Sequence, residues 1–307
     1  MKAINYLAVL SFAAFGFIVP VMAQDVSRDS TGLPGDNFSL EGALEMFKKA
    51  SSPDDFEKQI NSQGNNVNNL DLNEDGDIDY ISVIDNMGKD VHAFVLQVAV
   101  SATESQDIAV IELEKTGDES AILQIIGDED IYGELTIVEP GGEDDNSFMD
   151  NFDGNNIASG PNVAYSYTAP PLVINVWLWP SVRYVYAPAY IVYRSPWGWR
   201  HHPGWWRPWR PLRWHAFHPL RSRYHRSFVL VRTHRVVRAH KIYIPVRRHS
   251  VIVRTRHAAS VNNYRVTRSK TTITGPRGNT AIKKTTTVRG RNGKVKATKT
   301  NIRKRRR

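Results

Sequence analysis

The acidic residues of this 307-residue chain all lie in its first half, and this arrangement limits the ways in which the chain can fold. Residues 24–153 contain six Lys and Arg against all 31 Asp and Glu, which gives this part a net charge of −25. From Gly154 onward there are 33 Lys and Arg and no acidic residue, so this part carries +33. Regions of such opposite charge either attract each other within one chain or leave a cationic tail that binds something else.

The N-terminus has the pattern of a secretory signal peptide. Lys2 precedes an apolar run over residues 6–22, and the small residue Ala23 provides a cleavage site. Pro20 interrupts the run where a membrane-spanning helix would need to continue. Residues 1–23 are therefore predicted to be removed on export, which leaves a periplasmic, cell-surface or secreted protein.

The chain has no cysteine, and no later segment has the composition of a transmembrane helix. The exported protein can therefore form no disulfide and carry no lipid on a cysteine. The most apolar later segment, residues 170–192, is interrupted by prolines and an arginine. We expect the mature chain to be soluble or peripherally attached to a membrane.

Residues 24–38 are rich in Asp, Ser, Gly and Pro and are predicted to be a disordered leader. An acidic domain is predicted to follow over residues 39–140, and it begins with two short helices. Ser39 opens the first helix, because apolar residues at helical spacing follow it. The second helix is predicted from its N-cap Ser52 to about Ile60, with proline at the first helical position.

Short β-branched runs separated by turn residues predict the strands of the same domain. The gaps are short enough for successive hairpins, which predicts an antiparallel meander. The fold class is therefore α+β, with the two helices packed on the sheet. The predicted strands cover residues 80–84, 91–100, 108–113, 121–126 and 135–138.

The basic half has three compositions in succession. Residues 141–170 lack periodicity and are predicted to be a linker. Residues 171–225 hold all eight tryptophans, interleaved with Pro and Arg, and this segment is expected to be irregular or polyproline-like. Residues 226–307 are predicted to be a basic tail that is β-like or disordered.

Within this tail, residues 227–257 alternate apolar and basic residues, which predicts half-buried strands with one cationic face. Farther on, a weak 15-residue repeat aligns Gly275 with Gly290 and Lys284 with Lys299. Each copy is expected to be a polar hairpin or a disordered unit, and residues 303–307 to be a free tail.

One loop in the acidic domain has the spacing of a calcium site. Oxygen-bearing side chains stand at positions 1, 3 and 5, glycine at 6, a backbone carbonyl at 7, an apolar residue at 8 and a carboxylate at 9. Alternate side chains of such a tightly wound loop converge on one point, where a hard cation finds oxygen ligands. The candidate metal ligands are Asp71, Asn73, Asp75, Asp77 and Asp79, and calcium is the expected ion.

This loop resembles the DxDxDG loops of EF-hand and dockerin type, and the resemblance implies calcium binding rather than a particular fold. Two features depart from that pattern: Ser82 replaces the bidentate Glu at position 12, and residues 80–84 are strand-like where an EF-hand has a helix. An acidic turn before a strand is the alternative interpretation. Against it stands the repulsion of four nearby carboxylates that lack a counter-ion.

The cationic aromatic half suits an anionic membrane surface or a polysaccharide, with Arg on the anions and Trp at the interface. Alternatively, it folds back on its own acidic domain, with no external partner. Export argues against nucleic acid as the partner. The histidines of the basic half, including His201, His202, His215 and His218, are expected to be solvated or stacked on aromatic rings.

No catalytic motif occurs in the sequence, so an enzyme is not expected. The whole chain resembles uncharacterised exported proteins of Gram-negative bacteria that join a similar acidic domain to a Trp-, Pro- and Arg-rich stretch. This resemblance implies an envelope or surface location. The sequence therefore predicts an exported, non-enzymatic, calcium-binding protein whose basic half adheres to an envelope or extracellular polyanion or covers its own acidic domain.

Overall fold

The computed structural model has mixed helix and sheet architecture, so the predicted α+β class is confirmed. The predicted signal peptide (1–23) and all but the first residue of the predicted linker (141–170) lie outside the described residues. The structure describes residues 30–141, 173–231, 233–264, 266–274, 280–289 and 295–305.

Both predicted helices of the acidic domain are present, α1 (Leu40–Lys49) and α2 (Pro53–Ile60). Each begins at the predicted N-cap serine. The N–H of Gly42 donates to Ser39 Oγ (3.0 Å), and the N–H of Asp55 donates to Ser52 Oγ (3.1 Å). Local sequence therefore fixes where both helices start.

Residues 30–38 of the predicted disordered leader (24–38) are ordered, contrary to that prediction, and residues 24–29 lie outside the described residues. It contains the short helix η1 (Pro34–Asn37), and the Leu33 and Phe38 side chains on either side of it are buried. The buried Arg221 guanidinium donates to three carbonyls of this segment, those of Gly35, Asp36 and Phe38. Order here thus comes from the basic half, which composition alone does not reveal.

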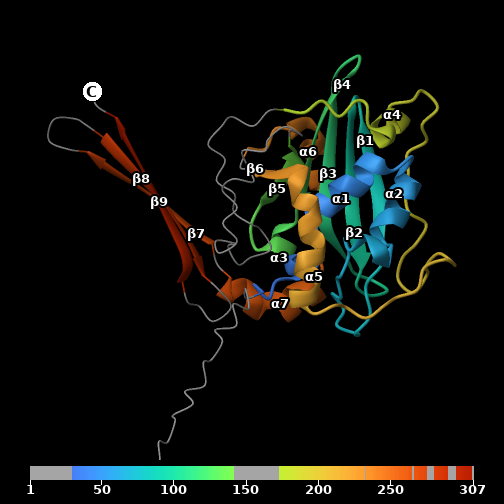
Figure 1. Cartoon of the computed structure of the whole chain (residues 1–307), viewed down its shortest axis with the longest axis horizontal. Helices are drawn as coiled ribbons and strands as arrows, with labels where there is room; N and C mark the ends of the chain where they lie inside the picture. Colours follow the sequence, from blue (N-terminus) through green and yellow to red (C-terminus); the bar gives the residue numbers. More distant parts are fainter. Residues whose placement is uncertain are drawn as a thin grey trace, which may run out of the picture.

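A six-stranded antiparallel sheet forms the centre of the molecule, with the strands in sequence order (Figure 1). Its first five strands include the five predicted ones. β3 is longer than predicted, and its pairing with β2 contains a bulge between Leu96 and Gln97. The strands are β1 (Ile81–Gly88), β2 (Val91–Ala99), β3 (Ser105–Gly117), β4 (Ser120–Gly127), β5 (Thr136–Pro140) and β6 (Phe228–Val231).

One face of the sheet carries the main hydrophobic core. Side chains that alternate along the strands, such as Phe94 and Ile111, join Phe47 of α1 and Phe56 of α2 in this cluster. Helix α4 (Pro180–Val185), from the Trp-rich segment, packs against the same core through Val182. The core is therefore completed by residues from the basic half.

The basic half also pairs with both edges of the five strands that the acidic domain contributes to the sheet. β6 pairs with β5 at one edge. At the other edge, the N–H of Asp85 in β1 donates to the Tyr193 carbonyl (2.9 Å), and the Ser195 N–H donates to the Val83 carbonyl (2.9 Å). Exposed edge strands are thus paired along part of their length by residues of the same chain.

Beyond the sheet, the basic half contains more helix than expected. The Trp-rich segment includes α4 and α5 (Trp214–Arg221), although most of it is irregular as predicted. The prediction of strands over residues 227–257 is correct only for β6. The rest forms α6 (Val237–Tyr243) and α7 (Val251–Asn263). The short helix α3 (Glu129–Tyr132) precedes β5.

Tertiary contacts explain why α6 forms despite its β-branched residues. The N–H groups of Arg238 and Ala239 donate to Oε1 of Glu114, which lies on β3 (2.5 and 3.1 Å). A carboxylate from another part of the chain thereby satisfies the first N–H groups of the helix. Helix α7 has a local cap, since the Val253 N–H donates to Ser250 Oγ (3.2 Å).

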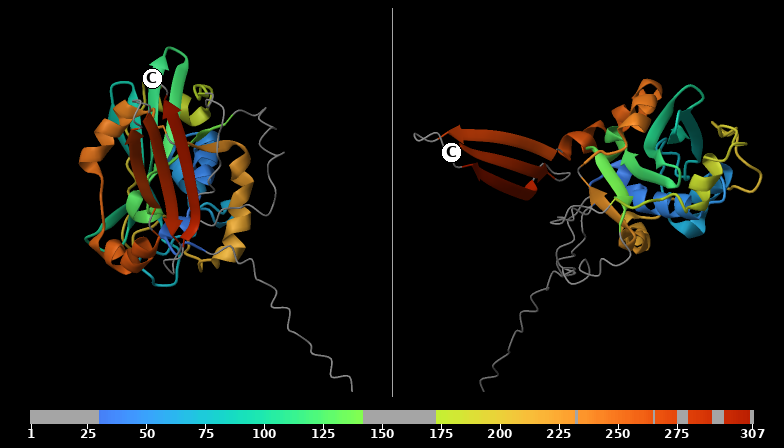
Figure 2. Two further views of the ribbon diagram at one scale, coloured as in Figure 1. Left: turned by 90° about the vertical axis from the view of Figure 1, so that its left-hand side faces the viewer. Right: turned by 90° about the horizontal axis from the view of Figure 1, so that it is seen from above.

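The C-terminal region forms a separate three-stranded antiparallel sheet, and Figure 2 shows it standing away from the main body beyond α7. Each copy of the repeat contributes one strand of this sheet and not the predicted hairpin or disordered unit. Its strands β8 and β9 form a hairpin in which Thr285 lies opposite Thr300. Residues 303–305, predicted as part of a free tail, belong to β9. The strands are β7 (Val266–Thr274), β8 (Thr280–Arg289) and β9 (Val295–Arg305).

Candidate functional site

The loop predicted to bind calcium is wound tightly around its own side chains. The Asp75 N–H donates to Asp71 Oδ1 (3.1 Å) and to Asn73 Oδ1 (2.9 Å). The N–H of Gly76 donates to Asp71 Oδ2 (3.0 Å), and that of Asp77 donates to Asp75 Oδ1 (3.0 Å). Gly76 has a φ of +88°, which a residue without Cβ adopts at little cost. The predicted sharp bend therefore lies at Gly76.

The end of the loop is anchored in the protein interior. Ile78 is buried, and its N–H donates to the Trp209 carbonyl (2.8 Å). The next N–H, of Asp79, donates to the Leu70 carbonyl (2.8 Å). The loop is thus fastened on one side to its own domain and on the other to the Trp-rich segment.

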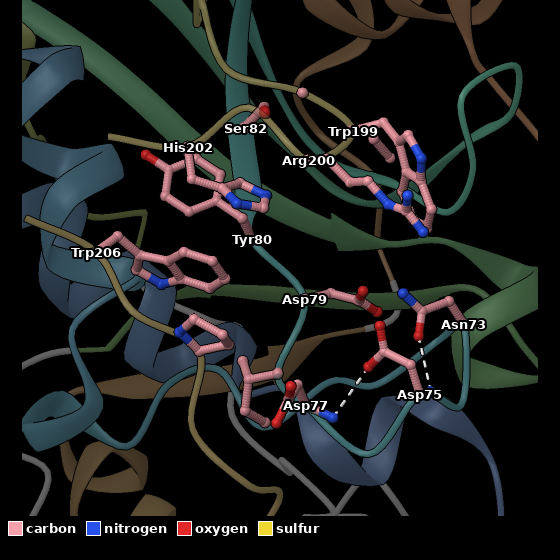
Figure 3. A pocket seen from close by; sticks show the side chains of 14 residues that line it. Asn73, Asp75, Asp77, Asp79, Tyr80, Ser82, Trp199, Arg200, His202 and Trp206 are labelled. Carbon is pink, nitrogen blue, oxygen red and sulfur yellow. Dashed lines mark hydrogen bonds between the residues drawn. The ribbon is translucent and has the colours of Figure 1, made fainter. Parts of the chain in front are cut away.

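Three of the five candidate ligands converge. Figure 3 shows the Asp75 and Asp79 carboxylates and the Asn73 amide turned toward one another, while Asp77 points elsewhere. Asp77 occupies position 7, where the backbone carbonyl rather than the side chain is the expected ligand. Asp71 accepts hydrogen bonds from the Asp75 and Gly76 N–H groups inside the loop. Asp71, Asp75 and Asp79 do not bring their ligand oxygens within 4.8 Å of one another. This donor set consists entirely of oxygen, which suits a hard cation.

The Asp79 carboxylate is the most perturbed group of the loop. Burial, followed by the nearby charges of Asp71 and Asp75, raises the pKa of Asp79 to about 7. Burial is also the main reason that the pKa of Asp71 is raised, with the charge of Asp75 contributing in the same direction. Ionising these carboxylates together is unfavourable without a cation among them.

Beside the attachment point at Ile78, a cavity of about 160 Å³ lies between the loop and part of the Trp-rich segment. Asn73, Asp75 and Asp79 lie on one side, and Trp199 and Arg200 lie on the other (Figure 3). The cavity is therefore bounded by acidic groups from one half of the chain and by a cation and aromatic rings from the other.

Ser82, which stands where an EF-hand has its bidentate Glu, serves a different purpose in this structure. It lies on β1, and its hydroxyl donates to the Trp197 carbonyl (3.1 Å). The residue at position 12 thus holds the Trp-rich segment at the rim of the cavity. Serine at position 12 therefore lacks the carboxylate ligand of the EF-hand pattern and provides this contact with the Trp-rich segment instead.

A second charged region lies on the sheet face opposite the main core. Here carboxylates of the acidic domain are covered by residues 234–254. The ion pairs join Arg235 to Glu139 (3.3 Å), Arg238 to Glu114 (3.0 Å), Arg247 to Asp128 (2.8 Å) and Arg254 to Asp130 (3.1 Å). The basic residues of this segment therefore meet acidic residues that lie 96 to 124 positions earlier.

Two histidines of the basic half pack against aromatic rings as the sequence predicted, but the prediction is wrong for His234, His240 and His249, which contact carboxylates brought to them by the fold. The His202 ring packs at a tilt against Trp206 (ring centroids 4.5 Å apart), and the His218 ring packs at a tilt against Trp214 (4.6 Å). Burial, with the neighbouring His201 as a smaller cause, lowers the pKa of His202. These rings serve as parts of aromatic clusters.

Two groups of possible metal ligands were not found from the sequence. In each group, three His or carboxylate side chains place one ligand atom each within 4.8 Å of the other two. Among the residues that the structure describes, only these two groups meet this condition. Their members are far apart in sequence, so no local motif could have indicated them. The groups are Glu112, His234 and His240, and Asp128, Asp130 and His249.

Comparison with protein-family models, curated proteins and solved structures finds no match to this chain. Within the described residues, no helix has the length and apolar character needed to cross a membrane.

Proposed function

We propose that this chain is an exported, non-enzymatic calcium-binding protein whose basic half serves mainly as a cover for its own acidic domain. The observation that carries the calcium proposal is the loop at residues 71–79. It combines the spacing of a calcium site with a tight turn and a buried carboxylate, Asp79, that is costly to ionise alone. A bound calcium ion would supply the positive charge that these carboxylates lack.

The ion would also stabilise the contact between the two halves. Because the Ile78 N–H donates to Trp209, ordering the loop orders the attachment point of the Trp-rich segment. Calcium would therefore be a structural ion, coupled to folding. Arg200 lines the same cavity and is the natural competitor for the carboxylates when calcium is absent.

A calcium titration of two matched variants tests this proposal on the full mature chain. Asp75→Asn and Asp77→Asn remove the same charge from the same loop, but only Asp75 offers a side-chain ligand. Asp75→Asn keeps Oδ1 as the acceptor for the Asp77 N–H, so the turn is preserved. We expect Asp75→Asn to weaken calcium binding by at least about tenfold and Asp77→Asn by about threefold or less.

Calorimetry with calcium, and with magnesium for comparison, gives the affinities, and melting curves with calcium or chelator give the coupling to folding. Equal weakening by the two variants would indicate a diffuse electrostatic effect rather than a ligand set. No heat of binding and no shift in melting temperature for the wild-type chain would reject the calcium site.

Adhesion to an anionic membrane or polysaccharide is a second candidate role, and exposed residues of the Trp-rich segment favour it. Trp205 is 47% exposed, and exposed arginines surround it in the sequence at positions 200, 207, 210 and 213. Guanidinium groups beside an exposed indole suit an anionic interface. Sedimentation with anionic vesicles that is lost in a variant with these four arginines changed to glutamine would support this role, whereas no sedimentation would reject it.

A further inference from the structure

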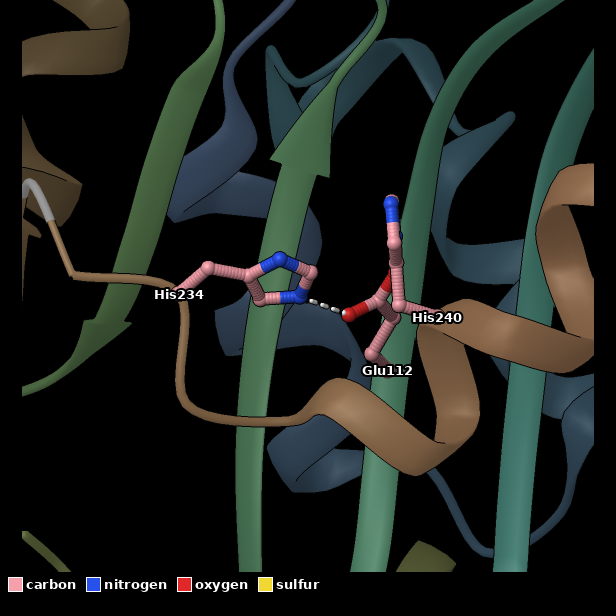
Figure 4. A group of neighbouring side chains, drawn as sticks. All are labelled: Glu112, His234 and His240. Atoms are coloured by element: carbon pink, nitrogen blue, oxygen red, sulfur yellow. Dashed lines mark hydrogen bonds and ion pairs between the residues drawn. The ribbon is translucent and has the colours of Figure 1, made fainter.

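We propose that Glu112, His234 and His240 form a binding site for a borderline divalent transition metal such as Zn²⁺, separate from the calcium loop. His234 Nε2 lies 2.5 Å from Glu112 Oε2, and His240 Nδ1 lies 2.6 Å from Glu112 Oε1. The two imidazole rings are 4.4 Å apart between centroids. Figure 4 shows both rings beside the carboxylate of Glu112.

Each ligand is held in place by groups other than its partners in the site. Glu112 lies in the middle of β3, paired with Ala93 of β2 and Gln124 of β4. The Gln124 side chain forms hydrogen bonds to the backbone on both sides of His234. Its Nε2 donates to the Thr233 carbonyl (2.9 Å), and its Oε1 accepts from the Arg235 N–H (2.7 Å). The ligand positions are therefore fixed by the fold, as a preorganised site requires.

His240 is positioned by the helix that contains it. It lies on α6, and the N-terminal N–H groups of that helix are bound by Glu114, two residues from Glu112 on the same strand. Glu114 thus sets the distance of α6 from the sheet.

The donor set distinguishes this site from the calcium loop. Two imidazole nitrogens and one carboxylate suit zinc and related ions, whereas an all-oxygen set suits calcium. Metal–ligand distances of ~2.0–2.2 Å require the three donor atoms to lie a few ångströms apart, and all three lie within 4.8 Å of one another. Small side-chain rotations are therefore sufficient to admit the ion.

The local charge also favours a cation. Glu112 is fully buried, while His234 and His240 retain 21% and 29% of their side-chain exposure, so the site opens to solvent on the histidine side. The arginines that lie beside the two histidines in the sequence, Arg235 and Arg238, form ion pairs with Glu139 and Glu114. With neutral imidazoles, the site carries the charge of one carboxylate, and solvent on the open side supplies a further ligand.

The other three-residue group has no carboxylate that is free of an arginine partner. In the group of Asp128, Asp130 and His249, Arg247 contacts Asp128 (2.8 Å) and Arg254 contacts Asp130 (3.1 Å). Both carboxylates already have a cationic partner, so a metal would have to displace two guanidinium groups. The comparison assigns the metal to the Glu112 group alone.

Zinc and cobalt titrations of the full mature chain, after treatment with chelator, test the proposal. We expect one Zn²⁺ per chain in competition with a chromophoric chelator, and a visible Co²⁺ spectrum typical of low coordination number. His240→Gln should abolish the Co²⁺ spectrum, and Glu112→Gln should weaken Zn²⁺ binding by at least the ~10- to 100-fold that is typical when a group that only orients a metal ligand is lost. His215→Gln, which changes an exposed histidine on α5, is the matched control and should bind as the wild type does.

Calcium binding by each variant shows whether it is folded, because the calcium loop lies outside this site. A variant that keeps its calcium affinity and loses zinc supports the proposal. Absence of zinc binding in the wild type, or equal zinc binding in the wild type and His240→Gln, would overturn it. If the wild-type chain does not bind calcium, circular dichroism of the same samples shows instead whether each variant is folded. The zinc result can therefore be interpreted even when the calcium proposal fails.

Discussion

The two faces of the six-stranded sheet are built from the same strands but are held by different forces. On one face, Phe94 and Ile111 join the apolar side chains of α1, α2 and α4. On the other face, Glu112, Glu114 and Gln124 surround a smaller apolar cluster and meet α6 and its flanking segments. Residues that are neighbours in the sequence of β3 thus contribute to opposite kinds of packing.

This difference gives the charge split of the sequence a structural meaning. We call the face that carries Glu112, Glu114 and Gln124 the acidic face. Exposing this face would be unfavourable, because its buried carboxylates need hydrogen-bond donors. Those donors come from the segment 234–254 in the basic half. We call the opposite face, which is covered by α1, α2 and α4, the helical face. Its stability should depend on apolar burial, which salt changes little. The stability of the acidic face should depend partly on interactions between charges, which salt screens.

The largest expected effect comes from a truncation on the helical face. Phe94 is fully buried against Phe47, with ring centroids 5.2 Å apart. We expect Phe94→Ala to lower the free energy of unfolding by about 3–5 kcal/mol, because it removes an aromatic side chain and leaves a cavity. Urea unfolding at low and at high salt measures this loss, which should be the same in both. A loss below about 1 kcal/mol would show that this face is not the main source of stability.

The next largest effect is expected on the acidic face, from replacing the neutral side chain of Gln124. Gln124 is buried and binds Thr233, Arg235 and Glu139 through its amide. Gln124→Leu should cost about 1–3 kcal/mol, because it leaves buried backbone groups without partners. The loss should persist at high salt, since no charge is removed. Gln59→Leu on α2, where one hydrogen bond to Asp55 is lost, is the control and should cost less.

Asp107 offers a way to separate the faces by pH. It is buried on the acidic face, because the bulge in β3 turns it toward Tyr243, and burial is the main cause of its raised pKa. A raised folded pKa contributes stability that is complete below the ordinary value of 3.8 and is lost as pH rises through the folded value. The free energy of unfolding should therefore fall with increasing pH above about 4 by this contribution.

Asp107→Asn should remove that contribution and flatten the dependence, apart from a constant loss of about 1 kcal/mol for weakened hydrogen bonds. Chemical unfolding measured at intervals from acid to neutral pH tests the slope. An identical slope in the variant would assign the pH dependence elsewhere. Other buried carboxylates with raised pKa values, Glu57 and Asp128 among them, remain in both proteins, so the difference between the two curves is the informative quantity.

The sequence predicted the helical face better than the acidic face, for a physical reason. Ser39 and Ser52 cap α1 and α2 locally, and the apolar periods of the strands mark which residues enter the core. Such signals lie within a few residues of the structure that they determine. The five strands and two helices of the acidic domain could therefore be placed in advance.

The acidic face depends on contacts that no local pattern encodes. Helix α6 is capped by Glu114, which is 124 positions away from Arg238, and its alternating sequence favours a strand when considered alone. His234 and Glu112 are 122 positions apart. The calcium loop lies between these extremes: its turn was predicted from spacing, but the contacts of Ser82 and Ile78 with the Trp-rich segment were not.

The smallest expected effect tests how the cover is held. Arg238 is 52% exposed, and its Nε lies 3.0 Å from Glu114 Oε2. Arg238→Gln should cost about 0.2–1 kcal/mol at low salt and almost nothing at high salt, because an exposed ion pair is screened. The backbone N–H of residue 238 still donates to Glu114, so the helix cap survives. Urea unfolding at two salt concentrations measures both values.

Glu114→Gln is the paired experiment, because it alters the buried partner instead of the exposed one. It weakens the cap of α6 as well as the ion pair, and it should cost about 1–3 kcal/mol at low salt with a remainder at high salt. If Arg238→Gln proved as costly as Glu114→Gln, the exposed cations would hold the cover and high salt should release it. The opposite ranking would mean that buried carboxylates and backbone donors hold it, and that the large positive charge mainly determines which surface the segment finds.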